Sequence, residues 1–466
     1  MSKKISVQLV QLNNRYGNQV YMPYSVGVLE SFVKQKEIIR KNYHFKEFIF
    51  LREDISNMVK KVGQVDILGI SCYLWNWKMS LKLAEEVRKK NPNCMIFLGG
   101  PHVPDNTDES FFKLYPFIDM TMHGEGELTF EETLIKYLNK ESLNNIIGAS
   151  FYDRNNSKKV YSNKKRERMK DYSLLPSPYL TGTFENLFKK YDYSWTLTWE
   201  TNRGCPFRCT FCDWGSAIAT RLEKFEEERL FKEIDYFSEK KIDLVFGADS
   251  NFGILKRDIK LAEKLAENKK KFGYPNRFTV CYTKNSTEKV FDLAKIFAEV
   301  GMHRGVSVSM QSLNGNTLKN IKRDNIKLDF FKSLQRKYVK ADMVTYTELI
   351  LPLPGETYES WKEGIDKLLD SSQHSGLIVY NANVMPNAEL GNKNYQEKYK
   401  IETAKIPLFQ AHSDKPIDDI LEYEPIIVGT DSMPTPQWKK AYKFTVFLQA
   451  CHYLGLLQAV TIVLRH

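Results

Sequence analysis

The most informative stretch of this sequence is Asn202-Arg-Gly-Cys205-Pro-Phe-Arg-Cys209-Thr-Phe-Cys212-Asp-Trp-Gly-Ser216. Its three cysteines fall within eight residues and follow directly on an expected strand at 195–201. Gly204 and Pro206 interrupt strand and helix periodicity, so we expect a loop that turns the thiolates towards one centre. Three thiolates suit a [4Fe–4S] cluster with one iron left open. A zinc site, which needs a fourth Cys or His nearby, and unliganded thiols are the alternatives.

The sequence after this loop alternates between strand-like and helix-like stretches. Six apolar strands are expected at 195–201, 244–249, 277–283, 304–312, 344–354 and 376–384. Six βα units are too few for a closed eight-stranded barrel but suit a partial one, in which functional groups lie on loops at the C-terminal strand ends. We therefore predict a partial (β/α)6 barrel over residues 193–400.

The first third of the chain has the same alternation with shorter strands. Its near-continuous apolar strands predict a parallel sheet covered on both faces, which is a doubly wound, Rossmann-like α/β domain over residues 1–155. Ligands of such sheets bind at the carboxyl ends of the strands. A basic stretch at 164–170, followed by Pro176 and Pro178, predicts a solvated interdomain linker over residues 156–192.

The last segment, residues 401–466, is expected to be short and mainly helical. Residues 444–464 contain no Asp, Glu, Lys or Arg, which raises the question of a membrane span. Gln449, His452, Gln458 and Thr461 are polar and are spread through this stretch. We therefore expect a buried helix, with membrane contact as the alternative, and a chain that could be a fragment of something longer.

The cysteine loop, Cys205-x3-Cys209-x2-Cys212 with Phe211 before the last cysteine, resembles the signature of the radical S-adenosylmethionine (SAM) superfamily. This resemblance implies that the cluster cleaves SAM to a 5′-deoxyadenosyl radical. It also implies that further residues at the strand ends bind SAM, although Gly247-Ala248-Asp249 departs from the usual Gly-Gly-Glu. The implied cofactor-binding residues are Phe211, Gly247, Asp249, Asn251, Ser307, Ser309, Gln311 and Arg323.

The first third resembles the cobalamin-binding domain of the class B, or cobalamin-dependent, branch of that superfamily. The Asp-x-His-x-x-Gly motif of its His-on members is absent, which leaves His102 as the only attractive histidine ligand, and a loop hydrogen bond is favoured over ligation there. The resemblance implies cobalamin contacts at Ser71, Tyr73, Gly99, Gly100, His102, Gly124, Glu125, Gly126 and Glu127.

Together these resemblances imply C-methylation of an unactivated carbon in a small metabolite, with cobalamin as the methyl carrier. A rearrangement or cyclisation without methyl transfer is the nearest alternative. A tRNA-modifying methylthiotransferase would need a second set of cysteines near the N-terminus, where only Cys72 and Cys94 occur. A corrinoid carrier without activity would not need the cysteine loop. The expected partners are a small-molecule substrate and an electron donor such as flavodoxin or ferredoxin.

Composition narrows the class of protein without naming a substrate. The 466 residues carry a net charge of +11 and seven cysteines. An odd cysteine count is unlike a secreted disulfide framework and favours a reducing, cytoplasmic location. No aromatic residues interleave the basic run, so no nucleic-acid partner is expected. We expect the four cysteines outside the loop (Cys72, Cys94, Cys281 and Cys451) to be buried in apolar surroundings.

Overall fold

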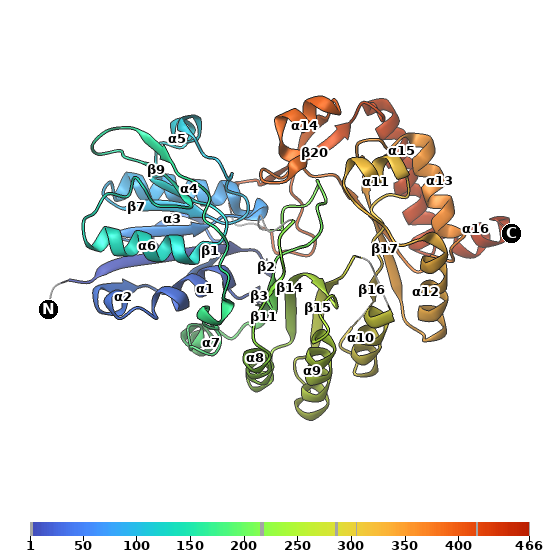
Figure 1. Cartoon of the computed structure of the whole chain (residues 1–466), viewed down its shortest axis with the longest axis horizontal. Helices are drawn as coiled ribbons and strands as arrows, with labels where there is room; N and C mark the ends of the chain where they lie inside the picture. The colour runs from blue at the N-terminus through green and yellow to red at the C-terminus, as the bar shows by residue number, and fades with distance from the viewer. Residues whose placement is uncertain (1–2, 215–218, 285–287, 304, 416–417, 466) are drawn as a thin grey trace.

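A computed structural model describes residues 3–214, 219–284, 288–303, 305–415 and 418–465. It contains the two expected α/β units, with the N-terminal unit in blue and cyan beside a curved array of strands and helices that runs from green to red (Figure 1). The end of the cysteine loop at Ser216 lies outside the described residues.

The N-terminal unit is one mixed sheet with the order β10-β9-β8-β7-β6-β1-β4, in which β5 also pairs with β1. Its strands are β1 (Ile5–Asn13), β4 (Tyr43–Phe45), β5 (Ile49–Leu51), β6 (Ile67–Ser71), β7 (Met95–Gly99), β8 (Met120–Met122), β9 (Ala149–Tyr152) and β10 (Val160–Ser162). Its helices are α1 (Tyr24–Val33), α2 (Glu37–Asn42), α3 (Ile55–Val62), α4 (Trp77–Lys90), α5 (Glu109–Leu114) and α6 (Glu127–Leu138).

Both faces of this sheet are buried, as predicted for a doubly wound domain. Val7 and Phe97 pack in one core with side chains of α1 and α6. Val10 and Ile96 pack in a separate core with side chains of α3 and α4. Adjacent strand positions thus face opposite helix layers, which explains why the strands are apolar throughout rather than alternating.

The expectation of a wholly parallel sheet is wrong at one edge. β9 runs antiparallel to β8, and β10 runs antiparallel to β9. An antiparallel edge on an otherwise parallel sheet is common, and a one-dimensional apolar pattern does not encode strand direction. β10 also lies inside the stretch that we expected to be linker.

The barrel unit has six strands, but they form two hydrogen-bonded groups among the described residues, β11-β14-β15 and β16-β17-β18. The strands are β11 (Ser194–Trp199), β14 (Leu244–Phe252), β15 (Arg277–Tyr282), β16 (Val306–Ser307), β17 (Thr345–Leu351) and β18 (Leu377–Asn381). The helices beside them are α8 (Glu227–Glu239), α9 (Asp258–Phe272), α10 (Glu288–Glu299), α11 (Gly315–Asn320), α12 (Leu328–Lys340) and α13 (Tyr358–Leu369). The pairs within each group are parallel, as a partial barrel requires.

Two short strands from the N-terminal third extend the barrel sheet. β3 (Gln19–Tyr21) pairs in parallel with β11, and β2 (Arg15–Tyr16) pairs with β3. The chain therefore passes from the N-terminal sheet to the edge of the barrel and back again before α1. The pairing of β3 with β11 therefore attaches a segment of the N-terminal third to the edge of the barrel sheet.

The basic stretch between the units is a loop with Lys164, Lys165, Glu167 and Lys170 exposed, and some of its charges are paired with other parts of the chain. Lys165 pairs with Asp105 at 2.7 Å, and Arg168 pairs with Glu125 at 3.0 Å. Arg168 Nη1 also donates to Thr220 Oγ1 at 2.7 Å, just after the cysteine loop. Opposite charges supplied by distant parts of the chain thus hold this segment against both units.

The C-terminal segment differs from the expected buried helix. It begins with an antiparallel pair, β19 (Glu402–Pro407) and β20 (Tyr423–Gly429), before α15 (Thr435–Leu448), a π-helical turn (Gln449–Tyr453) and α16 (Gln458–Arg465). Apolar side chains of the last two helices and of the turn before α16 are exposed, among them Phe447, Leu454, Leu456, Val463 and Leu464.

A single helix long and apolar enough to cross a membrane is not found in the described part of the chain. The helices at 435–453 and 458–464 pass such a test only as a pair, and they are bent by 103° relative to each other.

Candidate functional site

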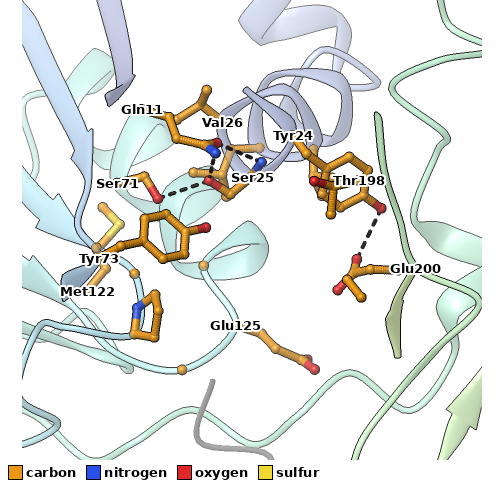
Figure 2. Close-up of a pocket in the computed structure, with 18 of the residues that line it drawn as sticks. Gln11, Tyr24, Ser25, Val26, Ser71, Tyr73, Met122, Glu125, Thr198 and Glu200 are labelled. Atoms are coloured by element: carbon orange, nitrogen blue, oxygen red, sulfur yellow. Dashed lines mark hydrogen bonds between the residues drawn. The ribbon is translucent and has the colours of Figure 1, made fainter. Parts of the chain in front are cut away.

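A cavity of about 740 Å³ lies between the N-terminal unit and the barrel. The N-terminal unit lines it with the loops that follow β6, β7 and β8, and the barrel lines it with the ends of β11 and β14. Figure 2 shows side chains from both units facing the same space, with Tyr73 and Glu125 on one side and Thr198 and Glu200 on the other. This is where both sheet types place their ligands, because the carboxyl ends of parallel strands meet there.

The cavity wall that the N-terminal unit supplies contains several glycines, which have no side chain. Gly99, Gly100, Gly124 and Gly126 all line it. Gly100 has φ +99°, and a Cβ there would lie 2.6 Å from the carbonyl oxygen of Cys72, so this turn excludes any larger residue. Backbone that can approach a ligand closely along several strand ends suits a large planar group such as a corrin ring.

An aromatic pair and a group of hydrogen-bonded polar side chains line the same wall. Tyr73 and Trp75 stack on each other with ring centroids 4.4 Å apart. Ser25 Oγ donates to Gln11 Oε1 at 2.7 Å and lies 2.9 Å from Ser71 Oγ, as the dashed lines in Figure 2 mark. A flat aromatic surface and a row of hydroxyl groups beside glycine turns are compatible with cobalamin, which has an apolar ring and amide side chains.

His102 stays a predicted cobalamin contact, and its surroundings favour the loop role that the sequence also allowed. It is not among the described residues that line the cavity; its ring packs edge-on against Trp77, with centroids 5.2 Å apart. Its backbone N–H donates to the carbonyl oxygen of Cys72 at 3.2 Å. Burial lowers the pKa of the His102 imidazole to about 4, so it is neutral near pH 7. The loop role is therefore the one that the geometry supports.

Glu125 and Glu127 line the cavity, but their carboxylates are engaged in binding protein groups. Glu125 accepts from Arg168, from the Tyr172 hydroxyl and from the backbone N–H of Met169. Despite the opposing effect of burial, these partners and Arg203 hold the pKa of Glu125 below its usual range. Contacts from these two residues to cobalamin stay predictions.

The cysteine loop lies at the end of β11 beside this cavity. Cys205 and Cys209 are almost completely buried, and Cys212 is partly exposed. Gly204, which precedes the first cysteine, has φ +118°, and a Cβ there would lie 2.3 Å from the carbonyl oxygen of Arg221. The loop therefore needs glycine at this position to close against its own returning segment.

The three thiols lie near one another, because Cys205 and Cys209 both act electrostatically on the Cys212 thiol. Among the described residues, no three His, Cys, Asp or Glu side chains are close enough to hold one metal ion. Three sulfur ligands of a single zinc ion would lie about 4 Å apart. The thiolates of a [4Fe–4S] cluster bind different irons and are spaced more widely, so the donor set fits a cluster better than zinc.

The predicted SAM residues of β14 are turned towards the loop rather than into open space. Both oxygens of the Asp249 carboxylate are engaged: Oδ1 accepts from the backbone N–H of Thr201 at 2.8 Å, and Oδ2 accepts from the Thr201 hydroxyl. Asn251 Nδ2 donates to Cys205 Sγ at 3.4 Å. A Cβ on Gly247 would lie 2.7 Å from Val280, so sheet packing alone explains that glycine.

The predicted SAM residues of the fourth barrel strand do come together. Ser307 Oγ and Ser309 Oγ are 3.2 Å apart, and Arg323 Nη2 donates to the carbonyl oxygen of Ser309 at 2.6 Å. Gln311 has φ +62°, and its buried side-chain oxygen has no hydrogen-bond partner within the described structure. An unsatisfied buried acceptor in a strained backbone conformation fits a site whose donor comes from a ligand such as SAM.

Three charged residues at this site were not predicted from the sequence. Glu200 accepts from the Tyr24 hydroxyl at 3.1 Å and pairs with Arg203, which also pairs with Glu127 at 2.7 Å. Lys284 Nζ lies 3.7 Å from Cys209 Sγ. Glu200 lies at the C-terminal end of the expected strand 195–201, and Arg203 and Lys284 come just after expected strands; these positions are the signal that could have identified them.

The four cysteines outside the loop differ in solvent exposure. Cys72 and Cys94 are buried, as predicted. Cys281 is exposed, which corrects the expectation for this residue, and Cys451 is partly exposed. Exposed Thr279 and Cys281 alternate along β15 with Phe278 and Tyr282, which are buried. Cys281 therefore lies on the more exposed face of β15.

Comparison with known families and proteins agrees with the two-unit architecture. Residues 199–368 match the radical SAM superfamily, and residues 26–134 match the B12 binding domain. Over 449 residues the chain is 35% identical to the cobalamin-dependent radical SAM methyltransferase TokK of Streptomyces tokunonensis. It is 34% identical over 436 residues to the 2-(S-pantetheinyl)-carbapenam-3-carboxylate methyltransferase of Streptantibioticus cattleyicolor.

These alignments include 96% and 93% of this chain but only 65% and 63% of the two relatives. The chain thus spans less than two thirds of the length of either. Among solved structures, the radical SAM methyltransferase TsrM from Kitasatospora setae has the same fold, with a TM-score of 0.64 and 15% identity over 88% of this chain and 79% of TsrM. The chain therefore joins a B12 binding domain to a radical SAM domain, with a cysteine loop beside the cavity between them, and over nearly its whole length it is similar to the cobalamin-dependent radical SAM methyltransferase TokK.

Proposed function

We propose that this chain methylates an unactivated carbon of a small metabolite, using a [4Fe–4S] cluster, SAM and cobalamin. The observation that carries the proposal is the shared cavity, because the glycine-rich strand ends of the B12 binding domain and the cysteine loop of the barrel border one space. The names of the two curated relatives support methyl transfer over a rearrangement.

When bound, the cluster would supply the electron that cleaves SAM, and cobalamin would supply the methyl group. The task of the protein is then to hold both centres and the substrate at contact distance and to keep water out. Cys205, Cys209 and Cys212 would hold the cluster, while Ser309, Gln311 and Arg323 would orient SAM beside it. The glycine turns at Gly99–Gly100 and Gly124–Gly126, with Tyr73, would seat the corrin ring.

The proposed substrate is a small molecule that enters the barrel mouth, and 2-(S-pantetheinyl)-carbapenam-3-carboxylate is the first compound to test, since the relative from S. cattleyicolor is named for it. The proposed electron donor is a flavodoxin or a ferredoxin. Free cysteines without disulfides support a cytoplasmic location.

The test is an anaerobic assay of the full chain loaded with iron, sulfide and cobalamin. With SAM whose methyl group is deuterated, we expect 5′-deoxyadenosine, S-adenosylhomocysteine and a product that gains a CD3 group, all measured by mass spectrometry. A product without the label would contradict methyl transfer and favour the rearrangement. The absence of 5′-deoxyadenosine would contradict the whole proposal.

Cys209→Ala provides the site-specific variant, and Cys281→Ser is its matched control because it removes one thiol outside the loop. We expect Cys209→Ala to lose reductive SAM cleavage by at least about 100-fold, which corresponds to about 2.7 kcal/mol. Cys281→Ser should keep the wild-type iron content. SAM cleavage that survives Cys209→Ala would show that the cluster lies elsewhere.

A further inference from the structure

Two neighbouring barrel strands each direct one hydrogen-bond donor at a different cysteine of the loop. At the end of β14, Asn251 Nδ2 donates to Cys205 Sγ at 3.4 Å. Just beyond β15, Lys284 Nζ lies 3.7 Å from Cys209 Sγ, within hydrogen-bonding distance of a sulfur acceptor. The proposed cluster would therefore have a neutral donor at Cys205 and a cationic donor, Lys284, at Cys209, where the Arg323 guanidinium also lies.

The position of Lys284 is fixed from two directions. Its backbone N–H donates to Asn251 Oδ1 at 3.4 Å, so one asparagine joins the two strand ends. Its ammonium group lies 5.7 Å from the centroid of the Phe211 ring, at a cation–π distance. Within the described part of the chain, Lys284 forms no ion pair with a carboxylate. Its positive charge acts on the cysteines instead: it lies at hydrogen-bonding distance from Cys209 and also interacts electrostatically with Cys212 of the same loop.

A cation at this point has a predictable effect on a cluster. Reduction adds one negative charge to a group already held by three thiolates. A nearby ammonium stabilises the reduced form more than the oxidised form, and hydrogen bonds to the cysteine sulfurs act in the same direction. The ammonium group therefore raises the reduction potential of the cluster. A cluster with a higher potential is easier for a protein electron donor to reduce.

We propose that Lys284 is a positioning residue that sets the reduction potential of the cluster through Cys209. This inference rests on the proposed function, since it requires the three-cysteine cluster. It assigns Lys284 a role in electron uptake rather than in binding SAM or substrate.

The experiment is a redox titration of the reconstituted full chain without SAM, followed by EPR of the reduced cluster. We expect Lys284→Met and Lys284→Gln to raise the ratio of oxidised to reduced cluster about tenfold at a fixed potential, which is about 59 mV for one electron. Lys284→Arg keeps the charge and should stay within about threefold of the wild type. Lys289→Met is the matched control, because Lys289 Nζ donates to the carbonyl oxygen of Ile254 and not to a cysteine.

The affinity for SAM, measured in parallel by equilibrium binding, tests the alternative that Lys284 is a SAM ligand. Lys284→Met should leave it within about twofold of the wild-type value. A tenfold weaker affinity with an unchanged potential would overturn the inference and identify Lys284 as a SAM ligand. Equal potentials in Lys284→Met, Lys284→Gln and the wild type would also overturn it. If the reduced wild type shows no cluster signal, the proposed function fails together with the inference.

Discussion

Asp249 shows how a single residue can serve the site without facing it. Its carboxylate is 1% exposed and accepts from Thr201 and Asn202, the residues that start the cysteine loop. Burial raises the pKa of this carboxyl to about 7, against the lowering effect of those hydrogen bonds. The folded chain therefore keeps a proton between about pH 4 and 7 that the unfolded chain releases, since the ordinary pKa is about 3.9. Stability should fall as the pH rises through this interval.

Asp249→Asn removes this titration and retains the shape of the side chain. We expect the decline in the free energy of unfolding between pH 4.5 and 7.5 to become shallower by up to about 1.4 kcal/mol per pH unit, with a correspondingly smaller decline in the unfolding temperature. Thermal unfolding followed by circular dichroism measures it. Asp108→Asn is the control, because that exposed helix cap has its pKa lowered by Ser110 and titrates below this interval. Equal slopes for Asp249→Asn and the wild type would show that Asp249 is ionised throughout.

At the level of elements, the stretch from α15 to α16 is apolar in composition but partly exposed. Leu456 and Leu464 are 72% and 81% exposed, although the stretch around them is uncharged. Leu456→Ser and Leu464→Ser should each change the free energy of unfolding by less than about 0.5 kcal/mol. Leu349→Ser, in the middle of β17 and 2% exposed, should cost roughly 3 kcal/mol or more. Chemical denaturation compares the three; a large loss at Leu456 or Leu464 would mean that this face is covered in solution.

At the scale of the whole molecule, one buried ion pair joins the two units beside the cavity. Arg203 lies near the start of the cysteine loop, two residues before Cys205, and Glu127 begins α6 of the N-terminal unit; their side chains are 14% and 5% exposed. Glu127→Gln should lower the free energy of unfolding by about 2 kcal/mol, less than a fully broken buried pair costs, because Arg203 keeps Glu200.

Glu109→Gln is the matched control in the same unit, since its partner Lys113 and Glu109 itself are both 73% exposed. Such a surface pair contributes between about 0 and 1 kcal/mol. Urea denaturation monitored by tryptophan fluorescence should separate the two variants. Equal stability would show that the Arg203–Glu127 pair does not couple the units.

Much of the architecture could be predicted because it depends on local pattern. Apolar strands alternating with amphipathic helices identify two α/β units, and the spacing of Cys205, Cys209 and Cys212 requires a loop that can hold a cluster. The direction of β9 and the transfer of β2 and β3 to the barrel edge could not be predicted, because strand pairing depends on residues far apart in the chain.

The sequence by itself indicated the chemistry that we propose for this protein, since cysteines at this spacing and glycines at strand ends are recognisable without the structure. Only the tertiary structure decided which polar groups are free for a cofactor. Glu125, Glu127 and Asp249 line or border the site, yet their carboxylates bind protein groups, whereas the Gln311 oxygen has no partner among the described residues. The reason is physical: a buried carboxylate must find donors, and which donors are near is settled by packing across the chain rather than by neighbours in sequence.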